Sequence, residues 1–400
     1  MSQTQSHEKI RVLFWATTFG ADMHSFARYL DNHPDYSIMN AMHNPDSFRK
    51  EGIQELHPIT SPMFDRESKL TFLRLLVFKP HILITDNHFP PLRFAKKLLV
   101  LWHGYGWRKD NMVGEFEAVH NNITRLVGDG RVPNPNFGWQ CYGAPDVEYR
   151  HMVSGFSMEN LHDIGFAQAD DLLNPPVSRE QAAPYYSIDI QARPTVLMAF
   201  TWHHGRILAH WGEDADLFQH LFALADRLEI NLLFRMHDRF RYSPEYHSHL
   251  DSLMRGRDNV MIKFKDEYPD NLLDMIVSDV MVSNYSSILN RFYVTGRPTI
   301  HIYPDRKEDE IQNWKKLGKD GTLVEQHVDD VSDAWKHPAE WHGGLMVHTY
   351  EEFVQALEQA LEDPDCCRVK ATEFIRDGIT GVDGRTCERT ENVLRSMVLE

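Results

Sequence analysis

The sequence of 400 residues has little cysteine and no long apolar run. Its four cysteines are Cys141, Cys366, Cys367 and Cys387, and they show no C-x-x-C spacing. A disulfide framework and a thiolate metal site are therefore not expected, and a reducing cytoplasm fits best. The polar segment 1–9 does not form a signal peptide, and no segment approaches the roughly 20 apolar residues that a membrane span needs. Peripheral attachment to the inner face of the cell membrane stays open.

The chain also lacks a net positive charge. It has 42 lysines and arginines against 58 aspartates and glutamates, which gives a formal net charge of −16. An acidic chain does not attract nucleic acid through its overall field, so no nucleic-acid partner is expected. The length and a hydrophobic content of 42% are those of a globular enzyme with two domains.

Familiar nucleotide and metal motifs are missing as well. There is no P-loop, no G-x-G-x-x-G after the first strand and no G-x-S-x-G elbow. The 23 histidines are densest at His203, His204 and His210 and at His247 and His249, without H-E-x-x-H or Cys/His zinc spacing. We therefore expect no metal and no cofactor.

Short apolar runs alternate with longer amphipathic ones. Such near-continuous runs predict strands of parallel sheets that helices cover on both faces. In the first half, strands are expected at 10–16, 81–86 and 97–102, with a helix at 24–32. In the second half, strands are expected at 195–201, 231–236, 260–264, 280–283 and, as the last, 298–303, with helices at 215–228, 350–361 and 389–398.

A proline-rich stretch at 167–194 divides these two series. The sequence thus predicts an α/β protein with an N-terminal domain at 1–190, a C-terminal domain at 191–365 and a helical segment at 366–400 that packs back across the domains. Two α/β domains of similar size suggest a cleft between them. Ligands of open α/β sheets bind beyond the carboxyl ends of the strands, which indicates where a site should be sought.

The first motif at such a strand end is the segment 101–109, with His103 between an apolar strand and two glycines. Gly104 allows close backbone approach, and Arg108 and Lys109 add positive charge. A histidine there can act as a general base near neutral pH. The alternative is a loop histidine without a catalytic role.

The second motif is the segment 233–238, where another strand ends in a cation and a histidine. Arg235 could clamp a phosphate with its two-pronged guanidinium, and His237 could donate to a phosphoryl oxygen. The alternative is an ion pair between Arg235 and a neighbouring carboxylate, beside a solvated histidine.

The third motif is the segment 278–287, in which a strand runs into Asn284, Tyr285, Ser286 and Ser287 before a helix. The two serines could cap that helix and leave backbone N–H groups facing a phosphate. The alternative is a plain serine cap without a ligand.

In their order along the chain, these segments resemble the CDP-glycerol glycerophosphotransferase family of teichoic-acid and capsule synthesis. That family's Trp-His-Gly-Thr-Pro-Leu-Lys-like motif reads Trp-His-Gly-Tyr-Gly-Trp-Arg at 102–108, and its Asp-x-x-Ile-Thr-Asp-Tyr-Ser-Ser motif matches 279–287. Similar short segments lie at 165–170, 199–202, 235–238, 297–300 and 383–389. Where the family has an arginine, an aspartate and two prolines, this chain has Gln168, Asn284, Asp238 and Gly106.

The resemblance implies a GT-B fold, with two Rossmann-like domains facing a central cleft. It implies an enzyme that transfers an alditol phosphate from a CDP-linked donor to a hydroxyl of a glycan or polyol-phosphate acceptor, with acceptor contacts in the N-terminal domain and the donor nucleotide in the C-terminal one. By position, His103 would be the base and His237 would contact the phosphate under attack. The other expected site residues are Gly104, Arg108, Lys109, Thr201, Arg235, Asn284, Tyr285, Ser286, Ser287 and Arg385.

Two other functions remain compatible with the sequence. One is a GT-B glycosyltransferase with a nucleotide-sugar donor, since a helix N-terminus serves any diphosphate. The other is a non-catalytic binding subunit on a degenerate GT-B fold. A single-step transferase is expected rather than a long polymerase, because the family's basic N-terminal extension is absent from the sequence.

Overall fold

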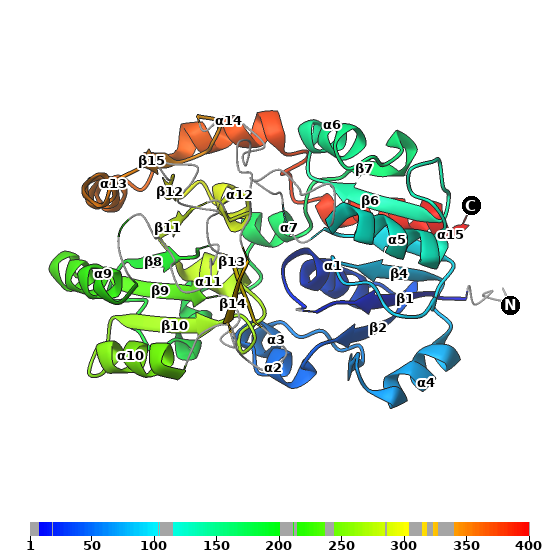
Figure 1. Ribbon diagram of the computed structural model, residues 1–400, viewed down its shortest axis with the longest axis horizontal. Coiled ribbons are helices and arrows are strands. Elements are labelled where there is room, and N and C mark those ends of the chain that lie inside the picture. The colour runs from blue at the N-terminus through cyan, green and yellow to red at the C-terminus, as the bar shows by residue number, and fades with distance from the viewer. Residues whose placement is uncertain are drawn as a thin grey trace, which may run out of the picture.

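The computed structural model describes residues 8–17, 19–102, 104, 115–200, 211, 214–236, 244–284, 286–303, 314–317, 323–326 and 340–399. These residues form two α/β domains that lie side by side, each with one central sheet flanked by helices (Figure 1). No helix in these ranges is long and apolar enough to cross a membrane.

The first sheet has seven strands in the order β3-β2-β1-β4-β5-β6-β7. All neighbouring strands are parallel, and β4 and β5 are almost completely buried, as expected for a sheet covered on both faces. The strands are β1 (Ile10–Trp15), β2 (Tyr36–Met42), β3 (Met63–Asp65), β4 (Ile82–Thr85), β5 (Lys97–Val100), β6 (Phe137–Cys141) and β7 (Leu161–Asp163).

The second sheet repeats this arrangement with six parallel strands in the order β10-β9-β8-β11-β12-β15. Numbered within its own domain, the order is 3-2-1-4-5-6, which the first six strands of the first sheet share and which is that of Rossmann domains. The predicted α/β class with two Rossmann-like domains is thus confirmed. The strands are β8 (Thr195–Met198), β9 (Asn231–Met236), β10 (Val260–Phe264), β11 (Val280–Ser283), β12 (Thr299–Ile302) and β15 (Leu345–Val347), and β13 (Trp314–Leu317) and β14 (Leu323–Gln326) form a separate antiparallel pair.

Helices cover both sheets and fill the space between the domains (Figure 1). The helices of the first domain and the connection are α1 (Ala21–Asp31), α2 (Pro45–Arg49), α3 (Gly52–Leu56), α4 (Lys69–Phe78), α5 (Glu115–Val127), α6 (Ala144–Met152), α7 (Gln168–Leu173) and α8 (Arg179–Ala182), with short 3-10 turns at Met158–Asn160 and Ala183–Tyr185. The remaining helices are α9 (Asp214–Leu228), α10 (Pro244–Met254), α11 (Leu272–Val277), α12 (Ile288–Tyr293), α13 (Tyr350–Glu362), α14 (Arg368–Gly378) and α15 (Thr386–Leu399).

One strand expectation was wrong. The run at 298–303 forms β12 but is not the last strand, because β15 adds to the sheet beyond it. β15 is only three residues long, and two of them are partly exposed. An apolar run of only three residues is too short to predict a strand.

The end of the chain connects the two domains. α14 contacts α12 of the second domain and α6 of the first, and α15 then packs on α1 and α7. The carboxylate of Glu391 on α15 accepts hydrogen bonds from the hydroxyls of Tyr29 and Tyr36, each at 2.8 Å. The last helix therefore belongs physically to the N-terminal core, although it follows the second domain in sequence.

Candidate functional site

The site lies where the carboxyl ends of strands from both sheets meet. β11 and β8 are neighbours at the point where the strand order of the second sheet reverses, and the third motif follows β11 directly. Ligands of Rossmann-like sheets bind at this reversal. β5 of the first sheet ends just before the first motif. The fold thus brings the motifs to the edges where a ligand is expected.

Gly104 and Ser287 touch across the domain boundary. A Cβ atom added to Gly104 would lie 2.1 Å from the Oγ of Ser287 and 2.6 Å from its Cβ. No side chain fits at either distance, so the close approach requires glycine. This contact joins the loop after β5 to the start of α12, two segments that are far apart in the sequence.

The start of α12 differs from the expected serine cap. Ser287 occupies the N-cap position, but its side chain makes no hydrogen bond to the helix backbone. The prediction that it caps the helix is therefore wrong, because its side chain faces Gly104 of the other domain instead. Ser286 precedes it as a partly exposed residue, while Asn284 is buried.

A buried histidine supports this turn from β12. His301 is 2% exposed and contacts the backbone of Asn284. Burial lowers the pKa of His301 to about 3, with the neighbouring His342 adding to the effect. The imidazole is therefore neutral at physiological pH and acts as a structural support for Asn284.

An ion pair between Arg291 of α12 and Asp22 of α1 links the domains. The two Nη atoms of Arg291 donate to the two carboxylate oxygens of Asp22 at 2.7 and 3.0 Å, and both side chains are at most 4% exposed. Burial acts to lower the pKa of Arg291, but the negative charge of Asp22 outweighs it and the pKa is raised. The pair is bidentate, which fixes the angle as well as the distance between the two helices.

Tyr142 connects this ion pair to the first motif. Arg291 donates to its hydroxyl at 2.9 Å, and that hydroxyl lies 3.0 Å from the carbonyl oxygen of Trp102. Burial raises the pKa of Tyr142 well above its usual value, so the hydroxyl keeps its proton. Because Trp102 directly precedes His103, the network reaches from α12 to the backbone next to the expected base.

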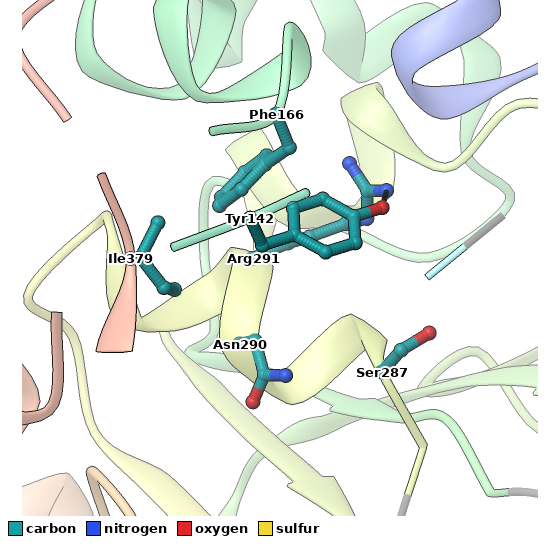
Figure 2. Close-up of a pocket in the computed structure, with 6 residues that line it drawn as sticks. All are labelled: Tyr142, Phe166, Ser287, Asn290, Arg291 and Ile379. Atoms are coloured by element: carbon teal, nitrogen blue, oxygen red, sulfur yellow. Dashed lines mark hydrogen bonds between the residues drawn. The ribbon is translucent and has the colours of Figure 1, made fainter. Parts of the chain in front are cut away.

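These groups line a small hollow between the domains (Figure 2). Figure 2 shows the guanidinium of Arg291 meeting the hydroxyl of Tyr142, with Phe166 beside the Tyr142 ring and Ser287 set apart. The guanidinium carbon is 5.0 Å from the centroid of the Phe166 ring. The hollow is lined by Tyr142, Phe166, Ser287, Asn290, Arg291 and Ile379.

Gln168 replaces the family's arginine at the same interface. Its backbone N–H donates to Asp22 at 3.1 Å, and its Oε1 accepts from Arg291 at 3.3 Å. Its Nε2 donates to Asn271 of the second domain at 2.9 Å. A guanidinium is thus present next to position 168, but α12 supplies it.

Arg235 is engaged by protein groups. Its guanidinium forms an ion pair with Asp274 and donates to the carbonyls of Asp270 and Tyr268, each at 2.7 Å. Lys263 also donates to Asp274, at 2.7 Å. This geometry matches the alternative interpretation of the second motif, an ion pair between Arg235 and a neighbouring carboxylate. A phosphate held by Arg235 would have to displace Asp274.

A second buried contact between the domains involves two carboxylates. The backbone N–H of Asp270 donates to Glu51 at 3.2 Å, and His24 lies 3.6 Å from the Asp270 carboxylate. Burial, together with the charge of Asp270, raises the pKa of Glu51 to about 8. Burial acts to raise the pKa of Asp270, but His24 outweighs it and the pKa falls to about 2. Glu51 is thus largely protonated at neutral pH beside a charged Asp270.

Arg385 has local partners. It is an exposed residue that pairs with Glu388 at 2.8 Å, and its backbone N–H donates to Asp383 at 3.1 Å. The next residue, Thr386, donates its N–H to Asp170 of α7 at 2.9 Å. The described contacts of Arg385 are those of a surface residue at the start of α15.

Several expected site residues lie outside the described part of the chain. These residues are His103, Arg108, Lys109, Thr201, His237 and Tyr285, and the histidines His203, His204 and His210 also lie outside it. The described strands β9 and β11 end at Met236 and Ser283, shortly before two of these positions. Within the described ranges, no cluster of three or more His, Cys, Asp or Glu side chains could hold a metal ion.

No sequence motif marks the residues that join the domains. Asp22, Tyr142 and Arg291 are each unremarkable in sequence, and Asp22 and Arg291 are 269 positions apart. One signal was available, because Arg291 interrupts an otherwise mostly apolar segment at 288–293. A charged residue in a buried helix needs a buried partner.

Solved structures with the same arrangement identify the class of fold. The wall teichoic acid polymerase TagF matches with a TM-score of 0.69 at 14% identity, over 97% of this chain and 89% of that one. A putative UDP-N-acetylglucosamine 2-epimerase from Listeria monocytogenes matches with a TM-score of 0.54 at 12% identity, over 97% and 96% of the two chains. A glycosyltransferase from Rickettsia africae matches with a TM-score of 0.51 at 10% identity, over 98% and 99%. The fold is therefore of the GT-B class.

A family model makes the assignment more specific. The model of the CDP-glycerol:poly(glycerophosphate) glycerophosphotransferases matches residues 8–310. The chain belongs to this family, which confirms the resemblance seen in its motifs and makes it an enzyme of the transferase class. No curated protein sequence matches the chain.

Proposed function

We propose that this enzyme transfers glycerol phosphate, or a related alditol phosphate, from a CDP-linked donor to a hydroxyl of a glycan or polyol-phosphate acceptor. The product would be part of a cell-surface polymer such as a teichoic acid, the polymer named for the similar polymerase TagF. The contact between Gly104 and Ser287 carries the proposal, because it puts the loop of the expected base against the expected donor-phosphate segment.

The proposed reaction is an in-line displacement at the second phosphorus of the donor. His103 takes the proton of the acceptor hydroxyl, whose oxygen forms a bond to that phosphorus. The bond from phosphorus to the bridging oxygen breaks, and CMP leaves with the electron pair. His237 would stabilise the charge that builds on the phosphoryl oxygens.

The remaining proposed contacts hold the diphosphate. Ser286 and Ser287 would hold the pyrophosphate, as would Arg235 once it is released from Asp274. Asn284 and Tyr285 of the same turn, Thr201 after β8, Gly104, Arg108 and Lys109 after β5, and Arg385 complete the proposed set. Basic groups and backbone N–H donors can neutralise a diphosphate without a metal ion.

We further propose that the enzyme acts in the cytoplasm, with peripheral attachment to the membrane. All four cysteines are free thiols, as a reducing compartment maintains them. Cys141, Cys367 and Cys387 are buried, so none of these three is placed for a disulfide with another chain. The proposed reaction is a single transfer to each acceptor.

The experiment is to incubate the purified protein with CDP-glycerol or CDP-ribitol and a glycan acceptor, and to measure CMP. We expect steady CMP release from the wild type and a loss of at least about 100-fold in His103→Ala, the lower range for a general base. The control variant is His151→Ala, an exposed histidine near the end of α6 that should leave the rate unchanged. Equally slow release by wild type and His103→Ala would refute the proposal.

A nucleotide-sugar donor is the second candidate, because two fold neighbours carry glycosyltransferase or UDP-sugar names. Thermal unfolding with a panel of nucleotides separates the two, since a ligand at 100 times its Kd stabilises the folded state by about 2.7 kcal/mol. The proposal predicts the largest shift with cytidine nucleotides. A larger shift with uridine or guanosine nucleotides would favour the sugar donor.

A further inference from the structure

A second hollow opens in the first domain, at the edge of the sheet where β1 and β4 end. It has a volume of about 470 Å³, which lies in the range of pockets that hold small ligands. Its walls come from the last residue of β1, the loop after β4, the residues just before α4, and the helices α4 and α5. The hollow between the domains shares no lining residue with it, so the two are separate.

The loop after β4 is fixed to the neighbouring strand. The hydroxyl of Thr85 lies 2.8 Å from the carbonyl oxygen of Trp15 and 2.7 Å from that of His88. The carboxylate of Asp86 accepts the backbone N–H of His88 at 2.8 Å, which closes the turn. The first side of the hollow is therefore held by buried polar groups.

Helix α5 holds the other end of this loop. The guanidinium of Arg125 donates to the carbonyls of Pro90 and Pro91, each at 2.7 Å, and to the side chain of Asn122 at 2.8 Å. Asn122 itself lines the hollow. The protein's own contacts thus give the hollow its shape, which lowers the ordering cost that a ligand would otherwise meet.

Three aromatic residues form the apolar part of the wall. Trp15 is buried, and its ring centroid lies 6.1 Å from that of Phe72 in an edge-to-face arrangement. Phe72 and Phe89 pack on the core of the domain and stay partly exposed. The negative face of an aromatic ring attracts the polarised C–H groups of a sugar ring. An open-chain alditol offers no flat C–H face of this kind.

The wall also carries a polar group that the protein does not use. Asn87 is partly buried, and its side-chain amide forms no hydrogen bond with the described part of the chain. An amide both donates and accepts, as the neighbouring hydroxyls of a sugar require. A few placed polar groups among apolar ones are typical of a site that orients a small ligand.

The charges around the hollow favour a neutral ligand. The only guanidinium that lines it in the described ranges, that of Arg66, donates to the hydroxyl of Thr17 at 2.9 Å. Glu67 contributes a carboxylate to the wall, and Asp86 lies at the foot of the loop. A phosphate would meet two carboxylates and a guanidinium that is already engaged, so a phosphate chain is disfavoured and an uncharged sugar is not.

The hollow lies beside the first motif. Trp15 pairs with Thr85, and Thr85 pairs with Val100, so β1, β4 and β5 end in one row. The N–H of Leu101 donates to the carbonyl of Thr85 at 2.8 Å. The loop after β4 and the segment that leads to His103 therefore leave the same sheet edge from adjacent strands, about 4.8 Å apart.

We propose that this hollow is the acceptor subsite and takes a sugar ring, so that the acceptor is a glycan rather than a polyol-phosphate chain. Phe72 and Phe89 would pack against the ring, while Asn87 and Glu67 would bind its hydroxyls. The subsite rests on the proposed function only for its role in the reaction, since sugar binding needs no donor.

The experiment is saturation-transfer NMR of the full chain without a donor. The probes are cellobiose, lactose and chitobiose, with glycerol 3-phosphate as the open-chain phosphate. We expect at least one disaccharide to bind and glycerol 3-phosphate not to displace it. Phe89→Ala should weaken that binding at least about tenfold through the lost ring contact, and Asn87→Ala about fivefold through the lost hydrogen bonds.

Two matched variants serve as controls. Phe264→Ala removes a partly buried phenylalanine from β10 of the second domain, and Asn121→Ala removes an exposed asparagine of α5 that does not line the hollow. Both should bind the disaccharide as the wild type does. Circular dichroism checks folding, and if Phe89→Ala is unfolded, the partly exposed Asn87 decides alone.

Three results would overturn the sugar subsite. They are the absence of binding to all three disaccharides, wild-type affinity in the folded hollow variants, and displacement of the sugar by glycerol 3-phosphate. Each contradicts the proposal on binding alone, without any measurement of turnover.

Kinetics with CDP-glycerol separate this inference from the proposed function. With the bound disaccharide as acceptor, Asn87→Ala should raise the acceptor KM about fivefold. Disaccharide binding without CMP release on any sugar or glycerol-phosphate acceptor would refute the proposed function and leave the sugar site standing. CMP release with a glycerol-phosphate acceptor and no disaccharide binding would do the reverse.

Discussion

At Gly104 the two domains approach each other so closely that no side chain fits between them. Gly104→Ala places a methyl group within 2.6 Å of the Ser287 Cβ, a distance that no rotation of the serine hydroxyl relieves. The two loops must move apart, and we expect kcat to fall at least tenfold, since small displacements in a site are costly. Steady-state kinetics on a folded variant measures this.

A second substitution tests whether the effect is steric. Ser287→Gly removes the opposing side chain, so Gly104→Ala combined with Ser287→Gly should recover the rate of Ser287→Gly alone. A double variant as slow as Gly104→Ala would mean that the methyl group does not act through Ser287.

The raised pKa of Glu51 predicts that the stability of the folded protein depends on pH. Burial, with the nearby Asp270, raises its pKa from an ordinary value of 4.5 to about 8. The folded protein therefore binds more protons than the unfolded chain between these values, and stability falls as pH rises from about 4.5 to about 8. For this one group, the slope inside the window is at most about 1.4 kcal/mol per pH unit.

Glu51→Gln isolates this contribution. The amide cannot ionise, so the variant should gain stability relative to the wild type as pH rises through the window and show no further relative gain above about pH 8. Calorimetric unfolding of both proteins across the pH range measures the difference. Parallel curves at all pH values would contradict the assignment.

At the scale of elements, α1 and α12 are joined by the Asp22–Arg291 pair. Arg291→Met leaves the Asp22 carboxylate buried without its main partner, which typically costs about 3–5 kcal/mol. We expect a clearly lower Tm and a lower kcat, because the Tyr142 contact to Trp102 loses its support. Calorimetry and CMP release provide the two measurements.

The paired replacement distinguishes a lost contact from an uncompensated charge. Asp22→Leu combined with Arg291→Met removes both charges, so it should recover most of the stability but not the rate. If the double variant is as unstable as the single one, the buried charge is not the cause.

Elements with continuous apolar runs could be predicted closely. The strands at 231–236, 260–264 and 280–283 have the expected bounds, because each is a short run rich in apolar residues, and the first and third are almost completely buried. β2 was not predicted, because its sequence Tyr-Ser-Ile-Met-Asn-Ala-Met mixes polar and apolar residues. Its Asn40 is buried and pairs with Ser61, a contact that the local sequence cannot reveal.

The candidate site could likewise be predicted from the sequence only in part. That the first and third motifs meet follows from strand ends and the cleft, which the alternation of elements predicts. The partners of Arg291 do not follow, because they come from α1 and from the residue after β6, which only the packed domains bring together. The preference of Arg235 for Asp274 over a ligand likewise depends on where α11 packs.

At the scale of the whole molecule, polar contacts hold the two domains in a defined relative position. Asp22, Glu51 and Gln168 of the first half contact Arg291, Asp270 and Asn271 of the second. The last helix, α15, returns the chain to the first domain, where Cys387 is buried in the core of that domain. This arrangement favours an enzyme whose catalytic loops are placed by fixed helices on both sides of the cleft.

The proposed function requires that the cleft between these domains transfers a phosphoryl group rather than a sugar. The most direct measurement is ³¹P NMR of the purified protein with CDP-glycerol and an acceptor that carries a free hydroxyl. We expect CMP and a new phosphodiester signal in equal amounts. Release of CDP, or loss of CDP-glycerol without a new phosphodiester on the acceptor, would contradict it.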